Sequence, residues 1–255
     1  LSDWSPDSRS LVVNSFSSQP NQLLSYPVGG GEPDTLFSSS DIFWPTWSPD
    51  GETILFASTA HEKGNIWAMP ASGGKPEAFD TNGEVVWYLD WSPDGNWIVV
   101  QTQGPHIAIV SASGGIPIQV TDSDLVSAAR TAAWSFDSRE LIYSAHPLIP
   151  GFQDQLAIMD TSGGNFRNLI HLSKEAGIQA SNGYDQRPSW SPDETHIAFT
   201  RMGADTSVCV VEVASGTQRV LASGFGQAWS PDGEEIAFAR DKILWSVPWT
   251  GGEPM

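Results

Sequence analysis

A tetrapeptide, Trp-Ser-Pro-Asp, recurs along this chain and constrains its fold more than any other feature. Five copies are intact, and a sixth, Trp134-Ser135-Phe136-Asp137, differs only in its third residue. The six copies begin at Trp4, Trp47, Trp91, Trp134, Trp190 and Trp229, so their spacings are 43, 44, 43, 56 and 39 residues. A period of about 40–45 residues is typical of β-propeller blades with four strands each.

The residues between the copies fit four short strands per repeat. A β-rich run such as Thr53-Ile54-Leu55-Phe56 follows the tetrapeptide, and a second run such as Ile66-Trp67-Ala68-Met69 comes after a variable loop. Gly-Gly turns at 73–74, 114–115, 163–164 and 251–252 then precede a fourth strand. Short runs bounded by Gly, Pro, Asp and Ser indicate an all-β protein. We therefore predict one domain, 1–255, a six-bladed β-propeller of four-stranded antiparallel blades that start near residues 1, 42, 86, 130, 185 and 225.

The tetrapeptide has a structural explanation. Proline sets the backbone at the second turn position, and Asp and Gly suit the last two, so Ser-Pro-Asp-Gly should join the first strand of each blade to the second. The Trp before the turn offers a large apolar ring that can fill the wedge between neighbouring blades. Ser8, Ser138 and Glu194 stand where the other copies have the turn glycine.

This pattern resembles the repeats of TolB-like, WD-like β-propellers, over essentially the whole chain. The clearest copies are Trp47-Ser48-Pro49-Asp50-Gly51 with Gly73-Gly74, and Trp91 to Gly95 with Gly114-Gly115. The resemblance implies a propeller fold and an interaction scaffold in the periplasm or elsewhere outside the cytoplasm, although a cytoplasmic location also fits the sequence. Such repeats serve many unrelated functions, so function must be argued from a site.

The last repeat is shorter than the others. Only 27 residues remain from Trp229 to the end, so the fourth strand of the last blade is expected to be missing. Because open propellers expose strand edges, which natural β proteins avoid, we expect the chain to be a fragment with more residues beyond one or both ends.

Composition excludes several classes of partner. The chain has 12 Lys and Arg against 30 Asp and Glu, a formal net charge of −18. Twelve basic residues cannot form the positive face that nucleic-acid binding requires. No apolar run approaches the roughly 20 residues of a membrane helix, so no membrane insertion is expected. The single cysteine, Cys209, excludes an internal disulfide.

Binding residues are expected on the loops between the second and third strands and on the connections between blades. Variable loops on a rigid scaffold often carry binding. Trp44, Trp87 and Tyr88 come just before first strands, and Tyr184, Asp185 and Arg187 occupy the same part of the fifth repeat. These side chains could bind a peptide or a sugar at the mouth of the central channel of the predicted propeller. The alternative is that they pack between blades.

The fourth repeat is longer than its neighbours, and its extra residues fall in two segments. One is 146–152, which contains His146 and Phe152, and the other is the connection 171–186. We expect both on the same face, where they could form a partner-binding ridge. The alternative is a tolerated surface insertion.

Metal and catalytic motifs are weak or missing. His61, His106 and His146 fall at similar positions of three consecutive repeats, but they belong to different blades, so we predict no metal site. There is no Gly-x-Ser-x-Gly, phosphate-binding loop, His-Glu-x-x-His or Cys-x-x-Cys, so no catalytic residue and no cofactor are predicted. Six acids belong to the repeat turns, and most others are expected to be surface charges.

The sequence thus favours a non-catalytic binding module for a protein or peptide. Its acidic charge would favour a basic segment of the partner. The alternatives are an accessory propeller of a prolyl-oligopeptidase-like peptidase, a sensor domain of a bacterial regulator, and a sugar-binding or lyase domain. The oligomeric state is left open.

Overall fold

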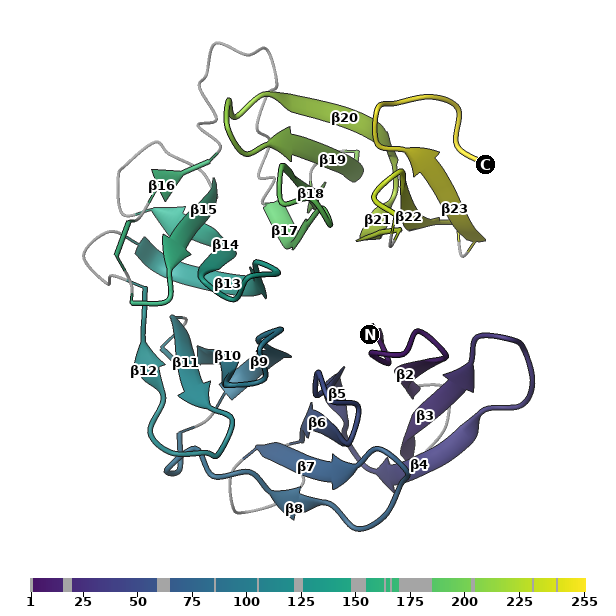
Figure 1. Cartoon of the computed structure of the whole chain (residues 1–255), viewed down its shortest axis with the longest axis vertical. Helices are drawn as coiled ribbons and strands as arrows, with labels where there is room; N and C mark the ends of the chain where they lie inside the picture. The colour runs from purple at the N-terminus through teal and green to yellow at the C-terminus, as the bar shows by residue number, and fades with distance from the viewer. Residues whose placement is uncertain are drawn as a thin grey trace. The chain divides into compact units, whose positions relative to one another are not determined.

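The described part of the computed structural model is built entirely from β-strands and turns. It comprises residues 2–15, 20–58, 65–84, 86–104, 106–121, 126–147, 155–162, 164–165, 167–169, 185–202, 205–230, 232–241 and 243–255. The strands form six antiparallel sheets, the blades of a six-bladed β-propeller (Figure 1). The chain divides into two compact units, Leu1–Gln119 and Val120–Met255. The prediction of a single domain stays a prediction.

Unit 1 holds the first three blades, each of four strands in chain order. The first blade has β1 (Ser2–Trp4), β2 (Ser10–Ser15), β3 (Asn21–Pro27) and β4 (Asp34–Ser39). The second has β5 (Phe43–Trp47), β6 (Thr53–Ala57), β7 (Ile66–Pro70) and β8 (Glu77–Ala78). The third has β9 (Val86–Trp91), β10 (Trp97–Thr102), β11 (Ile107–Ser111) and β12 (Ile118–Gln119). The predicted four-stranded repeat is confirmed here.

Unit 2 holds the other three blades. The fourth blade has β13 (Val126–Trp134), β14 (Glu140–Pro147), β15 (Gln155–Asp160) and β16 (Arg167–Asn168). The fifth has β17 (Asp185–Trp190), β18 (His196–Arg201), β19 (Ser207–Glu212) and β20 (Gln218–Ser223). In its described residues the last blade has three strands, β21 (Phe225–Trp229), β22 (Glu235–Arg240) and β23 (Ile243–Pro248), as predicted. Met255 exchanges two backbone hydrogen bonds with Ser246 of β23, at 2.8 and 3.0 Å.

Each tetrapeptide closes the turn between the first and second strands with the same side-chain contacts, which we call the Ser–Asp latch. In the second blade, Ser48 Oγ donates to Asp50 Oδ1 at 2.5 Å and accepts from Thr53 N at 2.9 Å. Asp50 Oδ1 also accepts from Glu52 N at 2.9 Å. The serine–aspartate bond recurs in all six blades at 2.5–2.7 Å. The latch therefore satisfies the polar groups of each turn locally.

The copy that lacks proline shows that the latch, and not the proline, defines the turn. Ser135 Oγ donates to Asp137 Oδ1 at 2.7 Å even though Phe136 stands in place of proline. In the copies without the turn glycine, Ser8, Ser138 and Glu194 adopt left-handed φ values of 58°, 61° and 58°. Non-glycine residues are strained in that region. The latch therefore imposes the glycine conformation even on residues that disfavour it.

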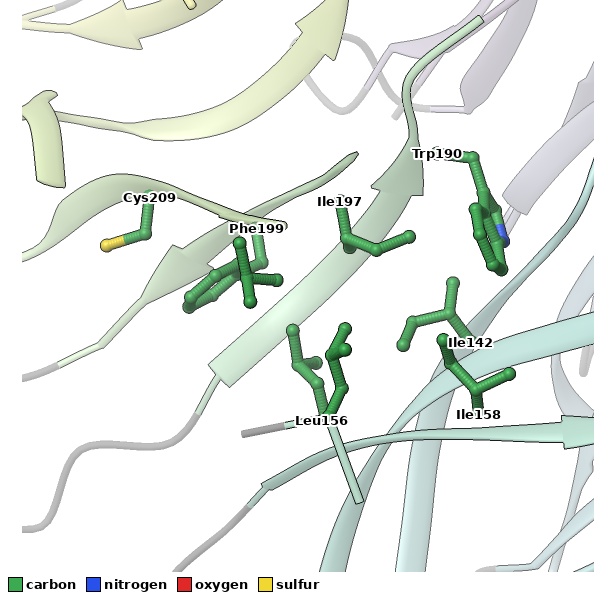
Figure 2. Packing of buried hydrophobic residues seen from close by; sticks show 9 residues of the cluster. Ile142, Leu156, Ile158, Trp190, Ile197, Phe199 and Cys209 are labelled. Atoms are coloured by element: carbon green, nitrogen blue, oxygen red, sulfur yellow. The ribbon is translucent and has the colours of Figure 1, made fainter. Parts of the chain in front are cut away.

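Four of the six repeat tryptophans pack between neighbouring blades of the same unit. In unit 2, Trp190 lies with Ile142 and Leu156 of the fourth blade and with Ile197 and Phe199 of the fifth (Figure 2). Trp47, Trp91 and Trp229 occupy equivalent clusters. Trp4 departs from the prediction, because it belongs to the first blade of unit 1 and leaves 50% of its surface exposed.

Candidate functional site

The antiparallel order gives every blade a turn end and a loop end. The turn end carries the Ser–Asp latch and the turn between the third and fourth strands. The loop end carries the loop between the second and third strands and the connection to the next blade. Among the described residues, the predicted binding residues belong to the loop ends of their strands: Trp44, Trp87, Tyr88, His146, Asp185 and Arg187.

Five of the six first strands begin at the loop end with the same β-bulge. In β5, Phe43 pairs with Ala57 and Thr46 with Leu55, so Trp44 and Pro45 together oppose one residue of β6. Equivalent bulges in β9, β13, β17 and β21 contain residues 87–88, 130–131, 187–188 and 226–227. Such bulges bend a strand, re-aim its side chains and are common next to functional sites. They place Trp44, Tyr88 and Arg187, which the sequence predicts to bind a partner, at similar positions of their strands.

In unit 1 the bulges bring two predicted residues together. The rings of Trp44 and Tyr88 meet edge to face, with their centroids 5.2 Å apart. Both residues are partly exposed, and Trp44 has a left-handed φ of 53°. The rings therefore pack between blades, as the alternative interpretation expected, and ligand binding by these aromatics stays a prediction. Trp87 lies in the backbone of β9, while its side chain is outside the described atoms.

A cluster of two carboxyl groups and one hydroxyl lies near the ends of the three first strands of unit 1. Asp3, Thr46 and Asp90 are the residues immediately before the repeat tryptophans. Asp3 Oδ2 accepts from Trp47 N at 2.8 Å and from the Thr46 hydroxyl at 3.0 Å. Thr46 Oγ1 also lies 3.4 Å from Asp90 Oδ1. Side chains from three blades thus meet in one hydrogen-bonded chain.

The protonation of this cluster follows from its burial. Burial and, to a lesser extent, the nearby Asp3 carboxylate raise the pKa of Asp90 to about 8, against weaker opposing effects of hydrogen bonds from Thr46 and the Trp91 backbone. Burial also raises the pKa of Asp3, although hydrogen bonds from Trp47 and Thr46 oppose the change. Because the Thr46 hydroxyl has a single proton to donate, a protonated Asp90 that donates to Thr46 completes the chain of hydrogen bonds. These two acids are not the surface charges that the sequence suggested.

In unit 2, uncharged side chains from the two neighbouring blades form hydrogen bonds to the bulge of β17. Arg187 has a left-handed φ of 53°. Its backbone N–H donates to Thr131 Oγ1 of β13 at 3.1 Å, and its carbonyl accepts from the Gln227 amide of β21. The Thr200 hydroxyl donates to Gln227 Oε1 and accepts from Gly226 N at 3.2 Å. The strained backbone of Arg187 is thus fixed from two sides.

A pocket of about 300 Å³ opens beside this bulge. Its lining comes from the loop ends of β17, β18, β19 and β21: Arg187, Thr200, Met202, Thr206, Phe225 and Gly226. Phe225 is 53% exposed and Arg187 is exposed. A second cavity, of about 560 Å³, lies among the outer strands of the first two blades of unit 1, with Phe37, Phe56 and Trp67 among its lining residues. The smaller pocket coincides with a predicted binding residue.

Several predicted residues remain untested. Phe152 and Tyr184 lie outside the described residues, as do 148–152 of the first insertion and 171–184 of the second. The backbones of His146 and Asp185 belong to β14 and β17, while their side chains are not described. Among the described residues, no group of three or more His, Cys, Asp or Glu is placed to hold a metal ion. Within the same residues, no helix is long and apolar enough to cross a membrane.

The fold of this chain is similar to that of several solved structures, TolB proteins among them. TolB from Acinetobacter baumannii superposes with a TM-score of 0.71 and 20% identity, over 95% of this chain and 61% of that one. A putative TolB from Agrobacterium tumefaciens gives 0.67 and 19%, over 88% and 83% of the two chains. An oligogalacturonate lyase in complex with manganese gives 0.70 and 11%, over 99% and 74%. These likenesses show the fold.

No protein-family model matches the sequence, and no curated protein matches it either. This chain spans 61% of the length of the Acinetobacter TolB.

The sequence carries a signal for some of the residues that join the blades and none for the others. Asp3, Thr46 and Asp90 were detectable, because aligning the repeats on their tryptophans places all three in one column. Thr131, Thr200 and Gln227 gave no such signal, since each acts on the backbone of another blade.

Proposed function

We propose that this chain is a non-catalytic binding module that holds a protein or peptide partner at the loop ends of its blades. The observation that carries the proposal is the bulge shared by five first strands, which presents Trp44 and Tyr88 at the loop ends of unit 1 and Arg187 at a loop end of unit 2. The fold shared with TolB proteins supports the same role. Aromatic rings and an arginine are the residue types that dominate protein-binding surfaces.

The charge of the chain narrows the kind of partner. With a formal net charge of −18, the protein attracts a basic segment and repels a polyanion. Binding should weaken as salt screens these charges. The resemblance of the repeats to TolB supports a location in the periplasm or elsewhere outside the cytoplasm.

Peptide binding tests the proposal directly. An array of random hexapeptides, probed with the labelled protein, should yield binders enriched in Lys and Arg. Tyr88→Ala and Trp44→Ala should each weaken those binders by about 10-fold, the usual effect of losing an interface aromatic. Tyr26→Ala is the matched control, since Tyr26 is 39% exposed at the turn end of β3. An array without binders, or equal losses in all three variants, would contradict the proposal.

A further inference from the structure

We propose that the pocket beside Arg187 binds the carboxyl-terminal residue of a peptide, through a carboxylate held by Arg187 and an apolar side chain laid against Met202 and Phe225. This inference rests on the proposed function and specifies which part of the partner enters the pocket. The pocket lies entirely within unit 2, between the fifth and last blades.

The first argument is the conformation of Arg187. Its φ of 53° lies in the left-handed region, which costs an L-residue about 1 kcal/mol or more. The structure maintains it with hydrogen bonds from Thr131 on one side and from Gln227 on the other. Gln227 is itself buried and held by Thr200. Fixing a backbone in this way is how a scaffold positions a binding side chain in advance.

The second argument is the chemistry of the lining. Arg187 is the one charged residue among the described residues of the lining. Its guanidinium has five donors in a planar fork that matches a carboxylate. The Thr206 hydroxyl lies 4.0 Å from the Met202 sulfur, a weak acceptor, so it can turn to a carboxylate oxygen instead. Thr200 is already both donor and acceptor within the bulge, so it contributes shape.

The third argument is size and charge. A volume of about 300 Å³ is at the small end of ligand sites, so it suits one or two residues. The exposed ring of Phe225 and the Met202 side chain offer an apolar surface beside the charge. A carboxyl-terminal apolar residue supplies both groups, whereas an internal Asp or Glu would leave the apolar surface uncovered. A polyuronate would carry many negative charges toward a protein of net charge −18.

The test uses two peptide arrays with the same random sequences, one with free carboxyl termini and the other with carboxamide termini. We expect the free-carboxylate array to give additional binders that end in an apolar residue, and their amides to bind about 10- to 100-fold more weakly, the usual range for a charge-assisted hydrogen bond. Arg187→Gly should reduce the free acids to the level of the amides. Glycine adopts the φ of Arg187 without strain, so this variant should fold.

Two further measurements separate the possible outcomes. Arg139→Gln makes the same change in net charge at a side chain that is 85% exposed at the turn end, and it should leave binding unchanged. If acids and amides bind equally and Arg187→Gly has no effect, the pocket inference fails while the proposed function stands. If neither array gives binders, both fail. If sodium galacturonate displaces the bound acids at a lower concentration than N-acetyl-leucine does, a sugar is the occupant and the peptide inference is overturned.

Discussion

The two units use the same bulge and the same Ser–Asp latch, yet they join neighbouring first strands in different ways. In unit 1, the residue before each repeat tryptophan is Asp3, Thr46 or Asp90, and these side chains connect three blades. In unit 2 the corresponding residues are Ala133, Ser189 and Ala228. There the connection moves to the bulge, where Thr131 and Gln227 hold the backbone of Arg187.

One propeller repeat can thus be joined to its neighbours by either titratable or neutral side chains. The carboxyl groups of unit 1 change charge with pH, whereas the hydroxyl and amide groups of unit 2 do not. We therefore expect the stability of the contacts between blades to depend on pH in unit 1 and not in unit 2. Hydrogen exchange measured by mass spectrometry reports on the two units separately and can test this contrast.

The largest effect is expected from Gln227→Ala in unit 2. The substitution removes the amide that binds the Arg187 carbonyl and the oxygen that accepts from Thr200. Buried polar groups without partners cost about 1–3 kcal/mol, so unfolding free energy should fall by about 2–3 kcal/mol. The loss should be the same at pH 5 and pH 8, as measured by urea denaturation. A loss of unfolding free energy that differs between pH 5 and pH 8 would contradict the expected difference between the units.

A smaller and pH-dependent effect is expected from Asp90→Asn in unit 1. The folded pKa of Asp90, about 8, lies above the ordinary value of 3.8. The folded state therefore holds this proton more tightly, so its stabilisation is complete below pH 3.8 and is lost as pH rises from 3.8 through about 8. Asparagine avoids the buried charge. Because Asp90 keeps part of its surface in solvent, we expect a gain of about 1–2 kcal/mol at pH 8.5.

The same variant should change stability little well below pH 3.8, where Asp90 is protonated in both states. Asp50→Asn is the matched control, because its pKa is lowered, chiefly by the hydrogen bond from Ser48. That variant should lose its effect as pH falls through the folded pKa of Asp50, the opposite direction. Equal urea midpoints for Asp90→Asn and the unmodified protein at pH 8.5 would contradict the assignment.

The smallest effect is expected at the turns that lack glycine. Ser138 has a φ of 61°, so Ser138→Gly should raise the unfolding free energy by about 0.5–1 kcal/mol. Glu194→Gly relieves a similar strain but also removes the bond that Asp137 N donates to Glu194 Oε1 at 3.1 Å. We therefore expect a smaller gain at Glu194, measurable as a smaller rise in Tm. Equal gains in Tm would show that the hydrogen bond from Asp137 N to Glu194 does not contribute to stability.

Most of the fold could be predicted because it rests on local signals. The Ser-Pro-Asp turn and the Gly-Gly turn are each closed by residues a few positions apart, as in the pairs Ser48–Asp50 and Gly73–Pro70. Their spacing along the chain then sets the number of blades. The prediction that proline shapes the turn was incomplete, since Ser135 and Asp137 form the same latch beside Phe136.

The site was less predictable because its contacts join distant residues. The bulge at Arg187 depends on the register between β17 and β18, which the sequence of either strand alone does not specify. Gln227 lies 40 residues from the carbonyl that it binds. Asp3 and Asp90 read as ordinary acids until the repeats are aligned, and their burial depends on packing across three blades.

The Ser–Asp latch has a consequence for how such chains arise. Every latch closes within six consecutive residues, as from Ser5 to Ser10, and takes no atom from another blade. A gene segment that encodes one blade therefore carries the instructions for its own turn wherever it is copied. Duplication can then add whole blades without redesigning their turns, and later substitutions such as proline to Phe136 are tolerated because the latch was inherited intact.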